Sequence, residues 1–178
     1  MSPRLKQAAL ALPILLLVFM VGRAEWQLAH SQTWHFAIRG YDPRDLLKGH
    51  YMRFQLSISP AETIDSCSVR DPDCCYCLEP GEGTEPRVAI ATCETASSTC
   101  DAFVRTVPLH ALDRFYIPEE GRRQMEQTLR TAARDDRAHL AVAVSRTGEP
   151  MIEALLVGGV PIRAAAAAEA AEAEAAGD

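Results

Sequence analysis

The N-terminal apolar segment constrains this chain more than any other feature. Arg4 and Lys6 precede an uncharged run, residues 7–22, that is rich in leucine and valine. Moving its large apolar side chains into a bilayer contributes about −3 to −5 kcal/mol, which outweighs the costs of Gln7 and Pro13. The run is short, because about 16 helical residues span only about 24 Å of a hydrocarbon core that is about 30 Å thick. Even so, we predict that this segment inserts into a membrane.

Two fates of the inserted segment remain open, a retained anchor and a cleaved signal peptide. Arg23 can extend its charged group to the interface and Trp26 suits the headgroup region, so the effective span lengthens. A signal peptidase would meet a charge in the middle of Gly22-Arg23-Ala24, which makes a poor cleavage site. We therefore predict an anchor over residues 7–24. The basic residues before it place residues 1–6 in the cytoplasm and the rest outside, as in a single-pass inner-membrane protein.

All six cysteines lie between residues 67 and 100, downstream of the export signal. An even number of cysteines in an exported chain predicts structural disulfides. The sequence does not choose their connectivity, although the adjacent Cys74 and Cys75 are poorly placed to bridge each other. The disulfide candidates are Cys67, Cys74, Cys75, Cys77, Cys93 and Cys100.

Two other interpretations of the cysteines compete with structural disulfides. Cys74 and Cys77 form one C-x-x-C pair, the spacing of thiol-redox proteins, but Asp71, Asp73 and the turn residues around the pair would raise a thiol pKa and offer no helix N-terminus. A zinc site needs four ligands, commonly two such pairs, and the chain has one. We therefore favour disulfides and expect no catalytic residue, metal or other cofactor.

Hydrophobic periodicity predicts an α+β fold, with a mainly antiparallel β domain over residues 25–163 and one amphipathic helix. The Ala/Glu-rich residues 164–178 form either a frayed solvated helix or a disordered tail. Residues 67–100 read as a cysteine-rich loop. The expected elements are strands at 33–39 and 51–59, a hairpin of 87–92 with 103–108, a helix from Pro118 to Arg134, and a hairpin of 139–145 with 151–157.

The most distinctive motif runs from residue 42 to residue 51. Asp42 has the properties of a helix N-cap, Pro43 suits the first helical position, and Gly49 suits a left-handed stop. This pattern predicts one short helical turn with a structural role. The motif residues are Asp42, Pro43, Arg44, Asp45, Gly49, His50 and Tyr51.

These residues resemble the GDYxxLxxxY family of bacterial membrane-anchored proteins, and so do residues 112–119 and 148–162. Compared with that family pattern, His50 replaces an aspartate, Phe54 a leucine and Ile58 a tyrosine. The His50 exchange counts against carboxylate chemistry at that position. The resemblance brings no activity with it. Because the family is often encoded beside multi-spanning membrane proteins, it implies a partner of that kind in the same membrane.

The sequence lacks the features that are typical of several function classes. The net charge of −6 offers no basic field for nucleic acid. The chain has no phosphate-binding glycine loop, nucleophile elbow or H-E-x-x-H motif, and its histidines lack metal-ligand spacing. We therefore predict a non-catalytic accessory or interaction module that works with a membrane or envelope partner. The alternative is an envelope thiol-redox or metal-binding protein that uses Cys74 and Cys77. Oligomeric state is not predicted.

Overall fold

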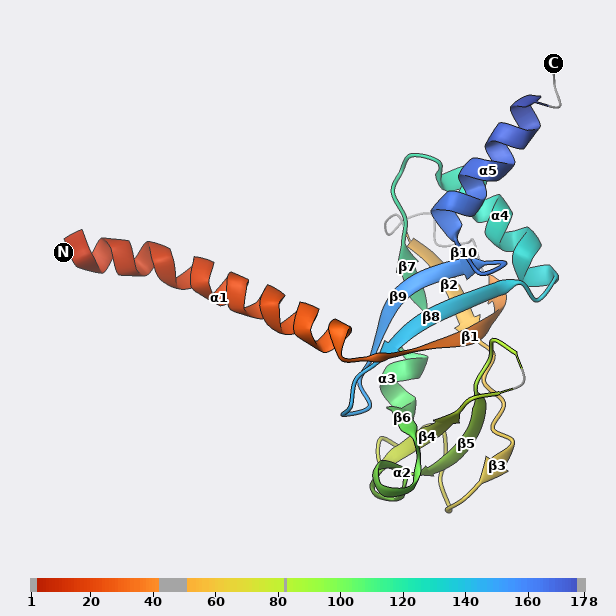
Figure 1. Ribbon diagram of the computed structural model, residues 1–178, viewed down its shortest axis with the longest axis horizontal. Helices are drawn as coiled ribbons and strands as arrows, with labels where there is room; N and C mark the ends of the chain where they lie inside the picture. Colours follow the sequence, from red (N-terminus) through yellow and green to blue (C-terminus); the bar gives the residue numbers. More distant parts are fainter. Residues whose placement is uncertain (1–2, 42–50, 82, 176–178) are drawn as a thin grey trace. The chain divides into compact units, whose positions relative to one another are not determined.

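The computed structural model describes residues 3–41, 51–81 and 83–175, which fall into two compact units (Figure 1). The first unit, Met1–Ser31, consists of helix α1 (Pro3–Ala29). The second, Gln32–Asp178, contains both sheets and the remaining helices.

Helix α1 has the length and composition of a membrane span. Its Leu12–Ala29 segment of 18 residues has a mean hydropathy of 1.4, and this length of helix covers about 27 Å, close to the roughly 30 Å of a hydrocarbon core. Large apolar side chains such as Leu15 and Phe19 are exposed. The helix runs on to Ala29 and does not stop at residue 24. Both a retained anchor and a signal sequence have these properties.

The second unit is built on a six-stranded antiparallel sheet with the strand order β10-β9-β8-β1-β2-β7. Alternate side chains on β1, such as Phe36 and Ile38, are buried, and Phe36 lies opposite Leu140 of β8. The alternation that predicted these strands therefore corresponds to a real buried face. The strands are β1 (Gln32–Tyr41), β2 (Tyr51–Leu56), β7 (Arg114–Tyr116), β8 (Ala138–Val144), β9 (Pro150–Val157) and β10 (Val160–Pro161).

Helices α4 (Arg122–Arg134) and α5 (Ile162–Ala175) lie on one side of this sheet (Figure 1). Helix α4 contacts β1, β8 and β9 and buries Met125 and Leu129. The Ala/Glu-rich run is helical as far as Ala175, and α5 packs against α4 with Ala166 buried. The Thr128 hydroxyl of α4 also donates to the Glu169 carboxylate of α5.

A second, smaller sheet is inserted between β2 and β7 and has the strand order β3-β5-β4-β6. We call residues 57–113 the insert. Its pairings are antiparallel except for the short parallel pair of β3 and β5. The insert contains β3 (Glu62–Thr63), β4 (Cys74–Glu79), β5 (Arg87–Thr92), α2 (Cys93–Thr99), β6 (Ala102–Arg105) and α3 (Thr106–His110).

The structure corrects four sequence predictions. The cysteine-rich stretch 67–100 is not one loop, because it contains β4, β5 and α2. The predicted hairpin of 87–92 with 103–108 is wrong, since β4 lies between β5 and β6 and pairs with both. Helix α4 begins at Arg122 and not at Pro118, because Gly121 at its N-cap has a left-handed φ of 73°. Beside α1, the described part of the chain holds four helices where one amphipathic helix was predicted.

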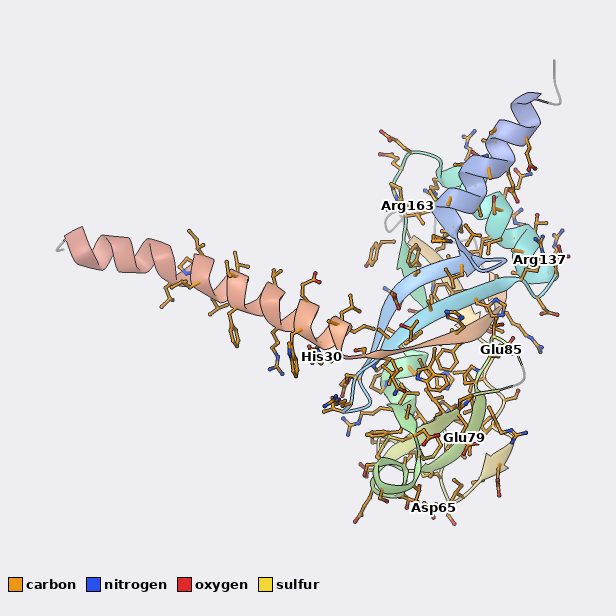
Figure 2. The ribbon with its side chains drawn as sticks, viewed as in Figure 1. His30, Asp65, Glu79, Glu85, Arg137 and Arg163 are labelled. Atoms are coloured by element: carbon orange, nitrogen blue, oxygen red, sulfur yellow. A yellow bond between two sulfur atoms is a disulfide. The ribbon has the colours of Figure 1, made fainter. Side chains whose placement is uncertain are left out.

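The β8–β9 hairpin, which the sequence predicted, joins the insert to the six-stranded sheet. The backbone N–H of Arg105 in β6 donates to the carbonyl oxygen of Gly148 in the hairpin turn at 3.0 Å. Elsewhere at this junction Glu85 lies 3.5 Å from the His139 ring of β8, and Figure 2 shows Glu85 on the side of the insert nearer the large sheet. The insert is thus attached at more than one point.

Candidate functional site

Strand β4 separates the cysteines because successive side chains on a strand point to opposite faces. Cys75 and Cys77 share one face, where Cys75 bonds to Cys93 at the start of α2 and Cys77 bonds to Cys100 at its end. Both ends of α2 are therefore bonded to one strand. Cys74 points to the other face and bonds to Cys67 in the preceding loop. All six cysteines predicted to form disulfides are thus at bonding distance in pairs.

This arrangement separates Cys74 from Cys77, the two cysteines of the C-x-x-C pair. Cys74 and Cys77 are three residues apart on one strand, so they lie on opposite faces, and each is bonded to a different partner. A disulfide between them would require β4 to unpair. Within the described residues no group of three or more histidine, cysteine or acidic side chains is placed to hold a metal ion.

The N-terminus of α2 is also fixed to the loop before β4. The hydroxyl of Thr92 accepts from the N–H of Thr95 as an N-cap, and the carboxylate of Asp65 accepts from the N–H of Thr92 at 3.2 Å. The N–H of Thr92, followed by the Thr95 hydroxyl, lowers the pKa of Asp65. Figure 2 shows Asp65 at the end of the insert away from the large sheet. This network is structural.

A groove opens beside the face of β4 that carries Cys74 and Tyr76. We call it the Tyr76 groove; it has a volume of about 650 Å³, within the range of known ligand sites. It is open to solvent along one side. Its lining comes from the chain after β2, from the loop closed by Cys67–Cys74, and from β4 and α3. The lining residues are Ile58, Pro60, Val69, Arg70, Tyr76, Val107, His110 and Ala111.

Three local interactions set the shape of the Tyr76 groove. The Cys67–Cys74 disulfide closes the short loop that carries Val69 and Arg70. The hydroxyl of Thr106, the first residue of α3, donates to the carbonyl oxygens of Asp71 at 3.2 Å and Cys74 at 3.0 Å. Helix α3 is thereby held against both the loop and β4. The groove is therefore built from fixed segments that are distant in the sequence.

The polar end of the groove is formed by a tyrosine and a histidine. The hydroxyl of the fully buried Tyr76 lies 3.0 Å from Nε2 of His110, and their rings meet edge to face. Burial raises the pKa of Tyr76 to about 12, and desolvation lowers the pKa of the His110 imidazole. Both groups are accordingly neutral at pH 7, and Arg70 supplies the formal charge among the lining residues.

The described lining is mainly apolar. Its polar side chains are Tyr76, His110 and Arg70, and it contains no serine, threonine, cysteine or carboxylate. An apolar surface with a few converging polar groups is typical of a recognition site. Sequence analysis did not identify this site. Pro108 was the missed signal, because a proline is unusual within a paired strand and is tolerated in the first turn of a helix such as α3.

The motif singled out in the sequence lies mostly outside the described residues, which include neither Asp42, Pro43, Arg44 and Asp45 nor Gly49 and His50. Its predicted helical turn therefore stays a prediction. Tyr51 begins β2 and lies opposite Tyr116 of β7 in the register. Phe54, further along β2, is buried in the main core. Tyr51, the motif residue that the structure describes, thus opens a strand of the six-stranded sheet and is not among the described residues that line the Tyr76 groove.

The titration of His110 gives a prediction about stability. Its pKa is lower in the folded state than the value of about 6.5 of an unfolded chain, so the unfolded state binds more protons. The contribution of neutral His110 to stability should therefore be fully present above about pH 6.5 and should fall as the pH drops below that value. We expect His110→Gln to reduce the loss of thermal midpoint between pH 7.5 and pH 5.5, measured on the full chain in detergent micelles. An unchanged pH dependence would contradict this assignment.

Comparison with known proteins gives one match. Neither the curated proteins nor the solved structures contain a match to this chain. A model of the GDYXXLXY protein family matches residues 13–155, from within α1 to the middle of β9. The letters GDYXXLXY in the family name spell a motif. When this motif is aligned on Gly49 and Tyr51, its leucine falls at Phe54 and its last tyrosine at Leu56. The position predicted from the sequence for that tyrosine, Ile58, is therefore wrong. Since the match covers most of both units, the chain belongs to the GDYXXLXY protein family.

Proposed function

We propose that this protein is a membrane-anchored, non-catalytic interaction module of the bacterial inner membrane. Its N-terminus lies in the cytoplasm, and its extracytoplasmic domain binds a segment of a multi-spanning membrane protein at the Tyr76 groove. The observation that carries this proposal is the groove itself, an open apolar surface on a disulfide-bonded insert. Exposed apolar surfaces of this kind mark interaction sites.

The anchor half of the proposal rests on helix α1. The apolar length of Leu12–Ala29 supports a membrane span, and the basic residues Arg4 and Lys6 before it support an N-terminus in the cytoplasm. Only His30 and Ser31 separate α1 from β1. A domain joined so closely to its anchor stays near the bilayer surface, and this confinement raises its effective concentration toward other membrane proteins. A weak contact is then sufficient for occupancy.

The cysteine pairing supports a module over the thiol-redox alternative. Cys74 and Cys77 are each bonded to another cysteine, on opposite faces of β4. Cys74, Cys75 and Cys77 are all buried, whereas a redox thiol must be reached by its substrate. The disulfides have an evident structural role, because they hold α2 and the loop that lines the groove.

The proposal is tested by photo-crosslinking in intact bacteria. A photoreactive phenylalanine analogue replaces Val107 at the groove rim. In the matched control the same analogue replaces Val160 on β10. The two valines are similarly exposed, at 43% and 45%. We expect a specific adduct with a multi-spanning membrane protein from Val107 and none from Val160, in chains that keep their full-length mass in the membrane fraction. Absence of a protein adduct from Val107, or loss of residues 1–24 from the mature chain, would refute the proposal.

A further inference from the structure

The electrostatics of the Tyr76 groove identify what kind of segment it binds. Arg70 is exposed, lines the groove, and makes no hydrogen bond or ion pair with any residue that the structure describes. The lining residues that the structure describes include no carboxylate to neutralise it. Asp71 and Asp73 follow Arg70 in the chain, but neither lines the groove, and the Asp71 side chain accepts from the N–H of Asp73 instead. Arg70 is thus available to an incoming group.

The position of Arg70 is restricted by its surroundings. The Cys67–Cys74 disulfide closes the loop on one side of Arg70, and the bond from Thr106 to the Asp71 carbonyl holds the other side. A guanidinium on a restrained loop loses less conformational freedom on binding than one on a free loop. Its planar donor array matches a carboxylate, with which it can form two parallel hydrogen bonds. The remainder of the groove offers the apolar side chains of Ile58, Val69 and Val107.

The open shape of the groove distinguishes a protein segment from a free lipid. Sites for small molecules bury most of the ligand surface, but Val69 and Val107 at this rim are 40% and 43% exposed. An acyl chain lying here would leave much of its surface in water. A segment that belongs to a folded partner is covered on its outer side by the partner itself, so both apolar surfaces are removed from water.

We propose that the Tyr76 groove binds an apolar protein segment that carries a carboxylate at one end, with the apolar side chains against Val69 and Val107 and the carboxylate on Arg70. This inference rests on the proposed function, since it names the chemistry recognised by the same groove. The carboxylate belongs either to an aspartate or glutamate side chain or to the C-terminus of the partner. These sources share the same contact with Arg70 and are separated by experiment.

The test combines the photoreactive group at Val107 with substitutions of Arg70. Arg70→Gln should lower the adduct yield about tenfold, the effect of losing one charged hydrogen-bonded pair, whereas Arg70→Lys should retain part of it. Arg87→Gln is the control, because Arg87 is an exposed arginine of the same insert that lies outside the groove. We expect it to leave the yield unchanged. Intact disulfides, measured by thiol counting, establish that each variant is folded.

Mass spectrometry of the adduct then identifies the crosslinked segment and the source of the carboxylate. If an acidic side chain is responsible, Arg70→Glu should abolish the adduct, and lysine at that acidic position should restore it. If a C-terminus is responsible, extending the partner by a few residues should abolish the adduct in the wild-type groove. A specific protein adduct that does not depend on Arg70, or a segment without a carboxylate, overturns this inference but leaves the interaction module intact. A lipid adduct with no protein adduct overturns both.

Discussion

Removing the disulfides one pair at a time should destabilise the domain in the order Cys77–Cys100, Cys75–Cys93, Cys67–Cys74. Their sequence separations are 23, 18 and 7. The entropy that each bridge removes from the unfolded chain corresponds to about 3.4, about 3.2 and about 2.4 kcal/mol respectively. Burial does not alter this order, because each pair joins one buried cysteine of β4 to one half-buried cysteine.

The measurement is guanidinium denaturation of the full chain in detergent micelles, followed by tryptophan fluorescence, with both cysteines of a pair changed to alanine so that no free thiol remains. Loss of both bridges to α2 should unfold this helix, since seven residues are too few for a stable isolated helix. A largest effect from Cys67→Ala with Cys74→Ala would contradict the prediction. It would show that the loop lining the Tyr76 groove, and not α2, dominates the stability of the insert.

The second large effect should come from Gly148 in the β8–β9 turn. Gly148 has a φ of 78°, and a Cβ atom there would lie 2.7 Å from the ring of Phe103 in β6. Gly148→Ala therefore combines left-handed backbone strain of about 1–2 kcal/mol with overpacking of about 1–3 kcal/mol. We expect the free energy of unfolding to fall by the sum of the two, about 2–5 kcal/mol.

Gly158 provides the matched control for this prediction. Its φ of 58° is also left-handed, but no atom lies within 4 Å of the position that a Cβ atom would occupy. Gly158→Ala should therefore show the backbone cost alone, about 1–2 kcal/mol. The difference between the two variants measures how closely the insert approaches the hairpin, and Phe103→Leu should recover part of it in a double-mutant cycle. Equal costs for both glycines would mean that the contact between Gly148 and Phe103 adds nothing.

Strands β1 and β2 of the large sheet were predictable because polar and apolar residues alternate along them, whereas β8, which is buried on both faces, was predictable as an apolar run. Alternation in residues 33–39 and 51–59 corresponds to β1 and β2, and the turn around Gly148 correctly separates β8 from β9. Strand β4 gave no such signal, since five consecutive residues from Cys74 to Leu78 are buried on both faces. A strand covered on both sides loses the polar and apolar alternation by which strands are recognised.

The Tyr76 groove could not be predicted for a different reason. Its walls come from residues 58–60, 69–70 and 107–111, which are brought together by β4, the Cys67–Cys74 bond and the hydrogen bonds of the Thr106 hydroxyl. His110 stands in the sequence as an isolated histidine, and its partner Tyr76 lies inside a cysteine cluster whose spacing suggests thiol chemistry. Periodicity reports local structure, whereas this site depends on contacts between distant segments, such as that of Tyr76 with His110, which are 34 residues apart.

The neighbouring cysteines Cys74 and Cys75 protect the register of β4. If the strand slipped by one residue against β5, every side chain would change face, and Cys75 would turn toward the partner of Cys74. Each of the three bonds would then be directed to the wrong side of the sheet. A slipped β4 therefore cannot form the three native bridges, so closure of the native disulfides selects the correct alignment of the strand.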